Sequence, residues 1–248
     1  MEHVVELDIS DRIGTITLDS QSNRNALSRQ LLSELHEALD RCEADDVRAI
    51  VLSHRGPAFC AGADLKERSS GPPDSGPFVR VLERLMDTPA PTIAAVDGAV
   101  RAGGIGLMAS CDLVVVNAAT TFALTEVRIG VAAAIISVPI LRRVPASRIA
   151  AAMLTGEPFD AQEARSMGLV THVSADVTAT TAGLCRGILA GAPRAVTETK
   201  RLLHRVATLD RSAGFTEMQQ LSNELFQSPD GAEGMRAFVE KRPPRWNS

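Results

Sequence analysis

Strand-like and helix-like segments alternate along the first half of the chain, and this order limits the possible folds more than any other feature of the sequence. Residues 4–9 and 12–18 alternate polar and apolar side chains, which predicts two strands. Leucines at helical spacing follow Ser28, a residue type that caps helix N-termini, so we expect a helix to begin there. A short apolar strand is expected next, at 49–53. The predicted order of these elements is ββαβ.

The alternation continues as far as residue 135. Residues 69–77 are rich in Gly, Pro and Ser, which predicts a flexible loop. Beyond this loop we expect a helix, a strand, a helix and two strands, at residues 78–86, 92–96, 103–110, 113–116 and 121–124. Such alternation is typical of α/β proteins, so the sequence predicts an α/β fold.

After Ile135 the strand signals fade, and the remaining sequence predicts mostly helix. Local signals mark where these helices begin or end: a capping box at Asp160 and Glu163, a terminating Gly168, and first-turn prolines at Pro193 and Pro229. Residues 192–248 are too few to hold an independent core. We therefore expect a core of residues 1–191 and a helical region of residues 192–248 that packs on this core or on a neighbouring subunit.

The composition is that of an ordinary globular protein, with 45% apolar and 23% charged residues and a formal net charge of −4 over 248 residues. This charge provides no broad attraction to nucleic acid or to an anionic membrane, so neither is expected as a partner. No apolar run approaches the roughly 20 residues that span a bilayer, and residues 1–10 lack signal-peptide features, which predicts a cytoplasmic protein. The four cysteines show no paired spacing, so we expect buried reduced thiols and no metal site.

Two segments, Ala58–Leu65 and Asp97–Gly106, place small residues where a strand gives way to a helix. Helix N-termini offer unpaired N–H groups, and small residues let a substrate approach that backbone. Two such turns brought together can form an oxyanion hole, a pair of donors for a carbonyl oxygen that gains negative charge. The alternative is that the Gly and Ala pairs only allow close packing of strand and helix. The run 103–106 does not match GxGxxG, so a dinucleotide site is not predicted.

Several motifs, in order and over nearly the whole chain, resemble the enoyl-CoA hydratase/isomerase (crotonase) family. They are Asn25-Ala26-Leu27, Ala58–Leu65, Ile93–Gly98, Cys111-Asp112, Thr155-Gly156, Ala164–Val170, Glu233–Phe238 and Glu240-Lys241-Arg242. The resemblance implies a crotonase-like (ClpP/crotonase) spiral of ββα units, followed by a C-terminal helical region that forms trimers or dimers of trimers.

The resemblance also implies a set of site residues. The backbone N–H groups of Ala63 and Gly103 align with the family's oxyanion donors, and Glu126 aligns with a catalytic glutamate. Coenzyme A is then expected as part of a thioester substrate, with no separate cofactor and no metal. Its candidate contacts are Ala61, Asp64 and Leu65, with Arg24, Lys66 and Lys241 as basic residues that either meet phosphate or are ordinary surface charges.

The chain departs from the family pattern at two positions. Gly106 stands where hydratases carry their first catalytic glutamate, and Ala134 stands where some isomerases have an aspartate. Glu126 is then the strongest candidate for acid/base work, unless it is a structural carboxylate paired with Arg128. Three functions stay open: an enoyl-CoA hydratase, a double-bond isomerase that uses one glutamate, and an acyl-CoA-binding protein without catalysis.

The surroundings of Gly106 and Glu126 are similar to a bacterial branch that hydrates branched glutaconyl-CoA. Such substrates have a distal carboxylate, and Arg101 is a hypothetical partner for it, with simple solvation as the alternative. Among the histidines only His54 lies near a motif, and we expect it to be a loop residue rather than a base. The sequence does not define the length or branching of the acyl chain.

Overall fold

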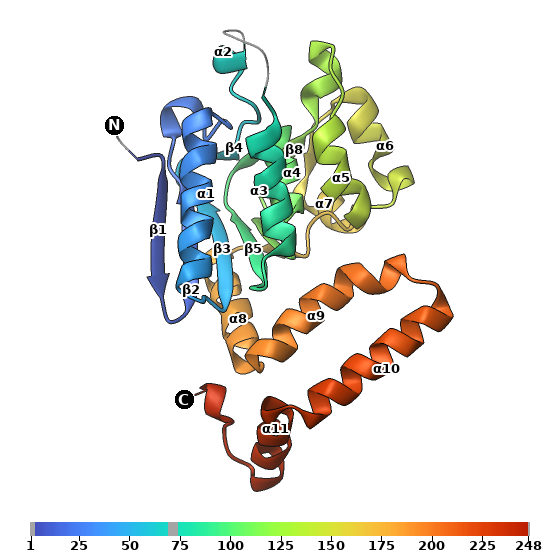
Figure 1. Cartoon of the computed structure of the whole chain (residues 1–248). Helices are drawn as coiled ribbons and strands as arrows, with labels where there is room; N and C mark the ends of the chain where they lie inside the picture. Colours follow the sequence, from blue (N-terminus) through green and yellow to red (C-terminus); the bar gives the residue numbers. More distant parts are fainter. Residues whose placement is uncertain (1–2, 69–73, 248) are drawn as a thin grey trace.

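The computed structural model describes residues 3–68 and 74–247. A six-stranded sheet forms the centre of the molecule, with strand order β1-β2-β3-β5-β7-β10 (Figure 1). Its strands are β1 (Val5–Ser10), β2 (Ile13–Leu18), β3 (Ala49–His54), β5 (Thr92–Val96), β7 (Leu113–Asn117) and β10 (His172–Ser174). The first pair is antiparallel, and every later pair is parallel.

A second, four-stranded sheet has the order β4-β6-β8-β9. Its strands are β4 (Ala58–Cys60), β6 (Ala99–Arg101), β8 (Thr121–Ala123) and β9 (Phe159–Asp160). The chain passes from large sheet to small sheet three times in succession, from β3 to β4, from β5 to β6, and from β7 to β8. Each small strand leads toward a helix, so the repeated unit is ββα.

The helices cover both faces of the large sheet. Up to residue 190 they are α1 (Arg29–Ala44), α2 (Leu65–Arg68), α3 (Gly76–Asp87), α4 (Gly103–Ala109), α5 (Ala134–Arg143), α6 (Ala146–Thr155), α7 (Ala161–Met167) and α8 (Val177–Ala190), with short 3-10 turns η1 (Gln21–Asn23) and η2 (Thr125–Ile129). Ile50 and Leu52 of β3 pack with α1 and α3 in a large apolar cluster, whereas Ala49 and Val51 pack with Cys185 of α8 in a smaller one. Alternate residues of a strand face opposite sides, and here both sides are covered.

The predicted helix signals are confirmed where they rest on local chemistry. The Ser28 hydroxyl accepts a hydrogen bond from the Leu31 amide (3.2 Å) at the start of α1. Asp160 and Glu163 form the expected capping box, and Gly168 ends α7 in the left-handed conformation. The predicted loop 69–77 is wrong at its end because α3 begins at Gly76, while residues 69–73 lie outside the described residues.

The strands β9 and β10 were missed by the sequence analysis, which predicted mostly helix after Ile135. The segment β10 pairs in parallel with β7 after a long excursion through three helices. Thr171 anchors it: the Thr171 hydroxyl donates to the Val114 carbonyl (2.7 Å) and accepts from the Val114 amide (2.9 Å). With three residues and a partner far away in sequence, such a strand leaves no periodic signal.

The four cysteines, Cys42, Cys60, Cys111 and Cys185, are buried and free, which confirms the prediction of reduced thiols. Burial raises the pKa of Cys42 to about 11 and that of Cys60 and Cys111 to about 12. Within the described ranges, no group of three His, Cys, Asp or Glu residues is arranged to bind a metal ion. No helix in those ranges is long and apolar enough to cross a bilayer.

Of the last three long helices, α9 (Pro193–Arg205) runs along the body of the molecule, while α10 (Arg211–Gln227) and α11 (Pro229–Glu240) lie farther from it (Figure 1). The predicted boundary between residues 191 and 192 falls in the turn between α8 and α9. Phe215, Phe226 and Phe238 are 73%, 64% and 87% exposed, respectively. Lys200 of α9 is buried against the core, whereas these phenylalanines of α10 and α11 have little cover within the described part of one chain, and the role of the helices in oligomerisation stays a prediction.

An ion pair between the buried Glu233 carboxylate and the partly exposed Arg242 guanidinium holds the chain end against α11. The Glu233 carboxylate accepts hydrogen bonds from Nη1 (2.7 Å) and Nη2 (3.1 Å) of Arg242 and from the Arg245 amide (3.1 Å). The Arg242 guanidinium holds the pKa of Glu233 at about 2, against an ordinary value of 4.5. This contact therefore favours the ionised carboxylate.

The Glu233 contact is expected to stabilise the protein in a pH-dependent way. Because its folded-state pKa is depressed, the stabilisation is fully present above the unfolded pKa of about 4.5 and is lost as the pH falls toward about 2. Glu233→Gln should therefore unfold at a lower temperature than wild type at pH 7, and the difference should shrink through that window. Glu240→Gln, at the exposed second partner of Arg242, should change little. A difference that does not vary with pH would contradict this.

Candidate active site

The first predicted donor, Ala63, lies in a loop that pairs with residues 24–27. The Leu27 amide donates to the Gly62 carbonyl (2.8 Å), and the Ala61 amide donates to the Arg24 carbonyl (3.1 Å). Asn25 supports this segment from within: it is buried, has a positive φ of 55°, and donates through its side-chain amide to the carbonyl of Ala58 (2.8 Å). These backbone pairs determine the direction in which the loop runs.

The second predicted donor, Gly103, follows a residue in an unusual conformation. Ala102 has φ 48° and ψ −120°, and its amide donates to the Ala123 carbonyl (3.0 Å) at the end of β8. An added Cβ on Gly62 would lie 2.9 Å from the Ala102 Cβ and 3.5 Å from the Gly103 amide nitrogen. The two loops are therefore in direct contact, and Gly62, itself at φ 92°, lets them approach.

The Ala63 and Gly103 amides have no acceptor among the residues that the structure describes, although neighbouring amides in both loops do. Unpaired N–H groups in adjacent loops are what a carbonyl oxygen requires if negative charge develops on it. The structure thus brings the two loops together as the sequence predicts. The role of the two amides as oxyanion donors stays a prediction.

Glu126 lies on η2, three residues after Ala123, the residue that accepts from the Ala102 amide. Its Oε2 atom is buried and has no hydrogen-bond partner within the described part of the chain. Burial raises the pKa of Glu126 above its ordinary value. A carboxyl group that is desolvated and has no cationic partner is suited to take up and release a proton.

The alternative in which Arg128 neutralises Glu126 is wrong. The Arg128 guanidinium forms an ion pair with Glu157 and also donates to the Thr155 carbonyl (3.0 Å) at the end of α6. Arg128 therefore ties η2 to α6, and the carboxylate of Glu126 is left without a paired charge in the described residues. Sequence spacing alone suggested the wrong partner because Glu157 lies far along the chain.

Gly106, where relatives are expected to carry a glutamate, faces a neighbour at very short range. An added Cβ on Gly106 would lie 2.2 Å from Cγ2 and 2.6 Å from Cβ of Ile136. Ile136 is 3% exposed and belongs to α5. The space next to Gly106 is thus filled. Where a glutamate side chain is expected in relatives, this chain has the branched apolar side chain of Ile136.

The candidate coenzyme A contacts on the first loop lie together. Asp64 accepts from the Asn23 side chain (3.1 Å) and from the Lys66 amide (3.0 Å), so it also caps α2. Leu65 is 60% exposed, and Lys66 and Arg24 are exposed beside it. Lys241 ends α11, at the opposite end of the molecule from α2 (Figure 1). Within one chain it therefore lies apart from this group.

Arg101 and His54, two other residues considered in the sequence analysis, both make hydrogen bonds that hold the backbone in place. Two Arg101 guanidinium nitrogens donate to the Thr121 carbonyl (2.6 Å) and hydroxyl (2.9 Å), and so join β6 to β8. These contacts favour a structural role for Arg101 over the hypothetical substrate carboxylate. His54 ends β3 and accepts from the Asp97 amide (2.9 Å) through Nε2, while burial lowers its pKa. His54 thus links the starts of the two site loops as a neutral side chain.

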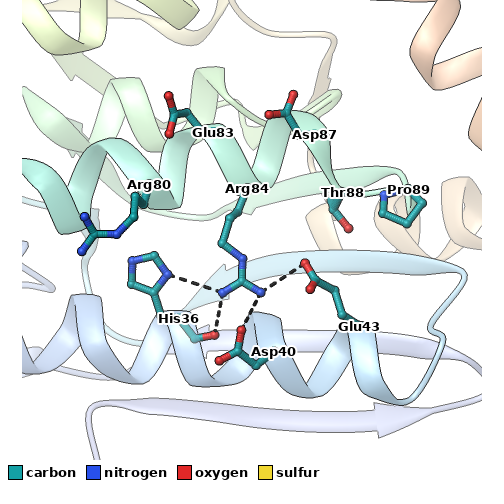
Figure 2. A pocket seen from close by; sticks show the side chains of 9 residues that line it. All are labelled: His36, Asp40, Glu43, Arg80, Glu83, Arg84, Asp87, Thr88 and Pro89. Atoms are coloured by element: carbon teal, nitrogen blue, oxygen red, sulfur yellow. Dashed lines mark hydrogen bonds and ion pairs between the residues drawn. The ribbon is translucent and has the colours of Figure 1, made fainter.

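A separate charged groove lies between α1 and α3 (Figure 2). The Arg84 guanidinium, at its centre, pairs with Asp40 (2.8 Å) and Glu43 (3.1 Å) and donates to the His36 carbonyl (3.0 Å). These contacts hold the two helices together. None of the predicted site residues lines this groove.

Comparison with known proteins identifies the family. A family model for enoyl-CoA hydratase/isomerase matches residues 8–248. The chain belongs to this family. A provisionally named enoyl-CoA hydratase of Thermus thermophilus is 37% identical over 245 residues, which cover 94% of this chain and 97% of the relative. Mitochondrial methylglutaconyl-CoA hydratase of Mus musculus is 32% identical over 237 residues, which cover 90% of this chain and 76% of its own.

Solved structures agree with this assignment. The crystal structure of an enoyl-CoA hydratase from Mycobacterium smegmatis superimposes with a TM-score of 0.93 at 32% identity, and the match covers 100% of both chains. The predicted crotonase-like α/β spiral is therefore confirmed. Both site loops and Glu126 were singled out from the sequence and their roles stay predictions, whereas Ile136 was not recognised as the neighbour of Gly106.

Proposed function

We propose that this member of the family is an enoyl-CoA hydratase that works with one glutamate. The observation that supports the proposal most is the partly buried Glu126 side chain, whose buried Oε2 atom has no partner in the described residues and whose pKa is raised by burial. It follows the strand that is bonded to the Gly103 loop, and the Ala63 and Gly103 amides of the two adjacent loops have no acceptor among the described residues. Coenzyme A is part of the substrate, and no separate cofactor or metal is proposed.

One carboxylate is sufficient for the proposed reaction because it handles a single proton. Glu126 takes a proton from water as the water oxygen forms a bond to C3 of the enoyl group. The electron pair of the double bond moves toward the thioester carbonyl, and the amides of Ala63 and Gly103 stabilise the resulting enolate oxygen. Glu126 then gives the same proton to C2, so the product contains one complete water molecule. Such donors typically contribute about 3–4 kcal/mol each.

Labelled water tests the proposal directly. Crotonyl-CoA, a longer enoyl-CoA and a branched acidic enoyl-CoA are each incubated with the protein in water enriched in heavy oxygen. The products are separated by liquid chromatography, and their masses are measured by mass spectrometry. A hydratase yields 3-hydroxyacyl-CoA that carries the label. A positional isomer of the substrate without label would instead support an isomerase. Binding without any product would support an acyl-CoA-binding protein.

Double-bond isomerisation is the second candidate, and the filled space at Gly106 favours it. Moving a proton between two carbon atoms requires one carboxylate and no bound water, and an apolar Ile136 beside Gly106 offers no group to position water. Hydration is proposed first because the Thermus thermophilus and Mus musculus relatives described above are named as hydratases. The label experiment separates the two reactions.

The proposal extends to substrate binding and assembly. Ala61, Asp64 and Leu65 are proposed to meet coenzyme A, with Arg24 and Lys66 near its phosphates, and Lys241 contributed by a neighbouring subunit. A homotrimer or a dimer of trimers would cover the exposed phenylalanines of α10 and α11. The cytoplasm is proposed as the compartment. Sedimentation of the purified protein tests the assembly.

A further inference from the structure

The contact between Gly106 and Ile136 is the tightest that a side chain at position 106 would meet. An added Cβ would lie 2.2 Å from Ile136 Cγ2, 2.6 Å from its Cβ and 3.3 Å from its Cα. Real Cβ atoms essentially never approach within 3.0 Å, so two of these three contacts exclude any residue other than glycine while Ile136 stays in place. Gly106 is itself buried on α4, about one helical turn after Gly103.

Ile136 cannot move aside without loss of other contacts. It is the third residue of α5, is 3% exposed and belongs to the large apolar cluster. At the far end of α5, the Arg143 guanidinium donates to the carbonyls of Cys111 (2.5 Å) and Asp112 (3.0 Å), just beyond the end of α4. The two helices are thus joined at both ends of α5, and Ile136 is held against Gly106.

We infer that Ile136 is the residue that restricts this site to a single carboxylate. Its side chain occupies the volume through which an acidic side chain at position 106 would have to leave α4. Gly106 and Ile136 therefore have to be replaced together. An acidic residue at position 106 gives the site a second carboxylate only when Ile136 is replaced as well. This inference rests on the proposed hydratase for its catalytic part, while its steric part depends on the packing of α4 and α5 alone.

The steric part is tested by melting temperatures in two backgrounds. Gly106→Ala and Gly106→Glu are each made in wild type and in Ile136→Gly, which leaves only the Cα at 3.3 Å. Ile136→Ala would not suffice because its Cβ remains at 2.6 Å. In wild type, each substitution at 106 should lower the melting temperature by about 2–12 °C. In Ile136→Gly the further loss should be less than half of that. Equal losses in both backgrounds, or no loss in wild type, would overturn the inference.

The catalytic part is tested in a protein that lacks Glu126. Gly106→Glu combined with Ile136→Gly is added to Glu126→Gln, and hydration of crotonyl-CoA is measured against pH. The new carboxylate should raise the rate of hydration at least about tenfold above that of Glu126→Gln alone. With Glu126 present, kcat/KM should show a second ionisation. A folded variant that shows neither the regained activity nor the second ionisation would overturn the inference. Absence of turnover in wild type would instead remove the proposed hydratase, and the melting temperatures would still decide the steric part.

Discussion

Glu126→Gln is expected to lower kcat for hydration by about 10²- to 10⁴-fold, with little change in KM. The substitution keeps the shape of the side chain but removes the carboxylate that we propose takes and returns the proton. Steady-state kinetics on crotonyl-CoA measures the loss. Glu157→Gln is the matched control, because Glu157 is a nearby exposed carboxylate that pairs with Arg128. Its kcat should stay within about threefold of wild type.

Glu126→Gln should also unfold at a higher temperature than wild type near pH 8. Burial raises the pKa of Glu126, so its ionised form is disfavoured in the folded protein, and a neutral amide removes that cost.

In wild type, kcat/KM should fall as the pH decreases through this raised pKa, because the protonated carboxyl group cannot accept a proton from water. A Glu126→Gln enzyme with the wild-type rate would exclude Glu126 as the catalytic base.

The parts of the fold that were predicted correctly are encoded by residues close together in sequence. Ser28 caps α1 because its hydroxyl reaches an amide three residues away, and the Asp160 capping box works over the same short distance. The site loops were visible for a similar reason. The close approach of the two loops requires small residues at the end of a strand, and these residues lie within a few positions of Ala63 and Gly103.

The features that sequence analysis missed join residues that are far apart in the chain. Ile136 meets Gly106 across 30 positions, and Arg128 pairs with Glu157 rather than with Glu126, two residues before it. No local pattern records such a contact, because it depends on how α4, α5 and α6 are placed against one another. The absence of a second glutamate was predicted from the family motif, whereas the reason why it cannot simply be restored required the packed structure.

Lys200→Met is expected to lower the free energy of unfolding by about 3–5 kcal/mol. Lys200 and Asp112 form an ion pair at 2.9 Å, and their side chains are 4% and 7% exposed. The Lys200 ammonium also donates to the carbonyls of Leu85 and Ala90 (3.1 Å each), while Asp112 accepts from the Thr92 amide (2.7 Å). Methionine would leave the Asp112 charge buried beside carbonyl oxygens that have lost their donor. Urea unfolding at pH 7 measures the change.

The comparison of single and double variants decides whether the buried charge causes this loss. Asp112→Asn added to Lys200→Met removes the remaining charge, so the double variant should be more stable than Lys200→Met alone. Arg201→Met, at an exposed pair with Glu198, should change the free energy by less than about 0.5 kcal/mol. Because Lys200 lies on α9 and Asp112 lies just after α4, a large loss for Lys200→Met would mean that the packing of α9 on the core contributes to the stability of the whole fold. A loss below about 1 kcal/mol would mean that α9 separates from the core at little cost.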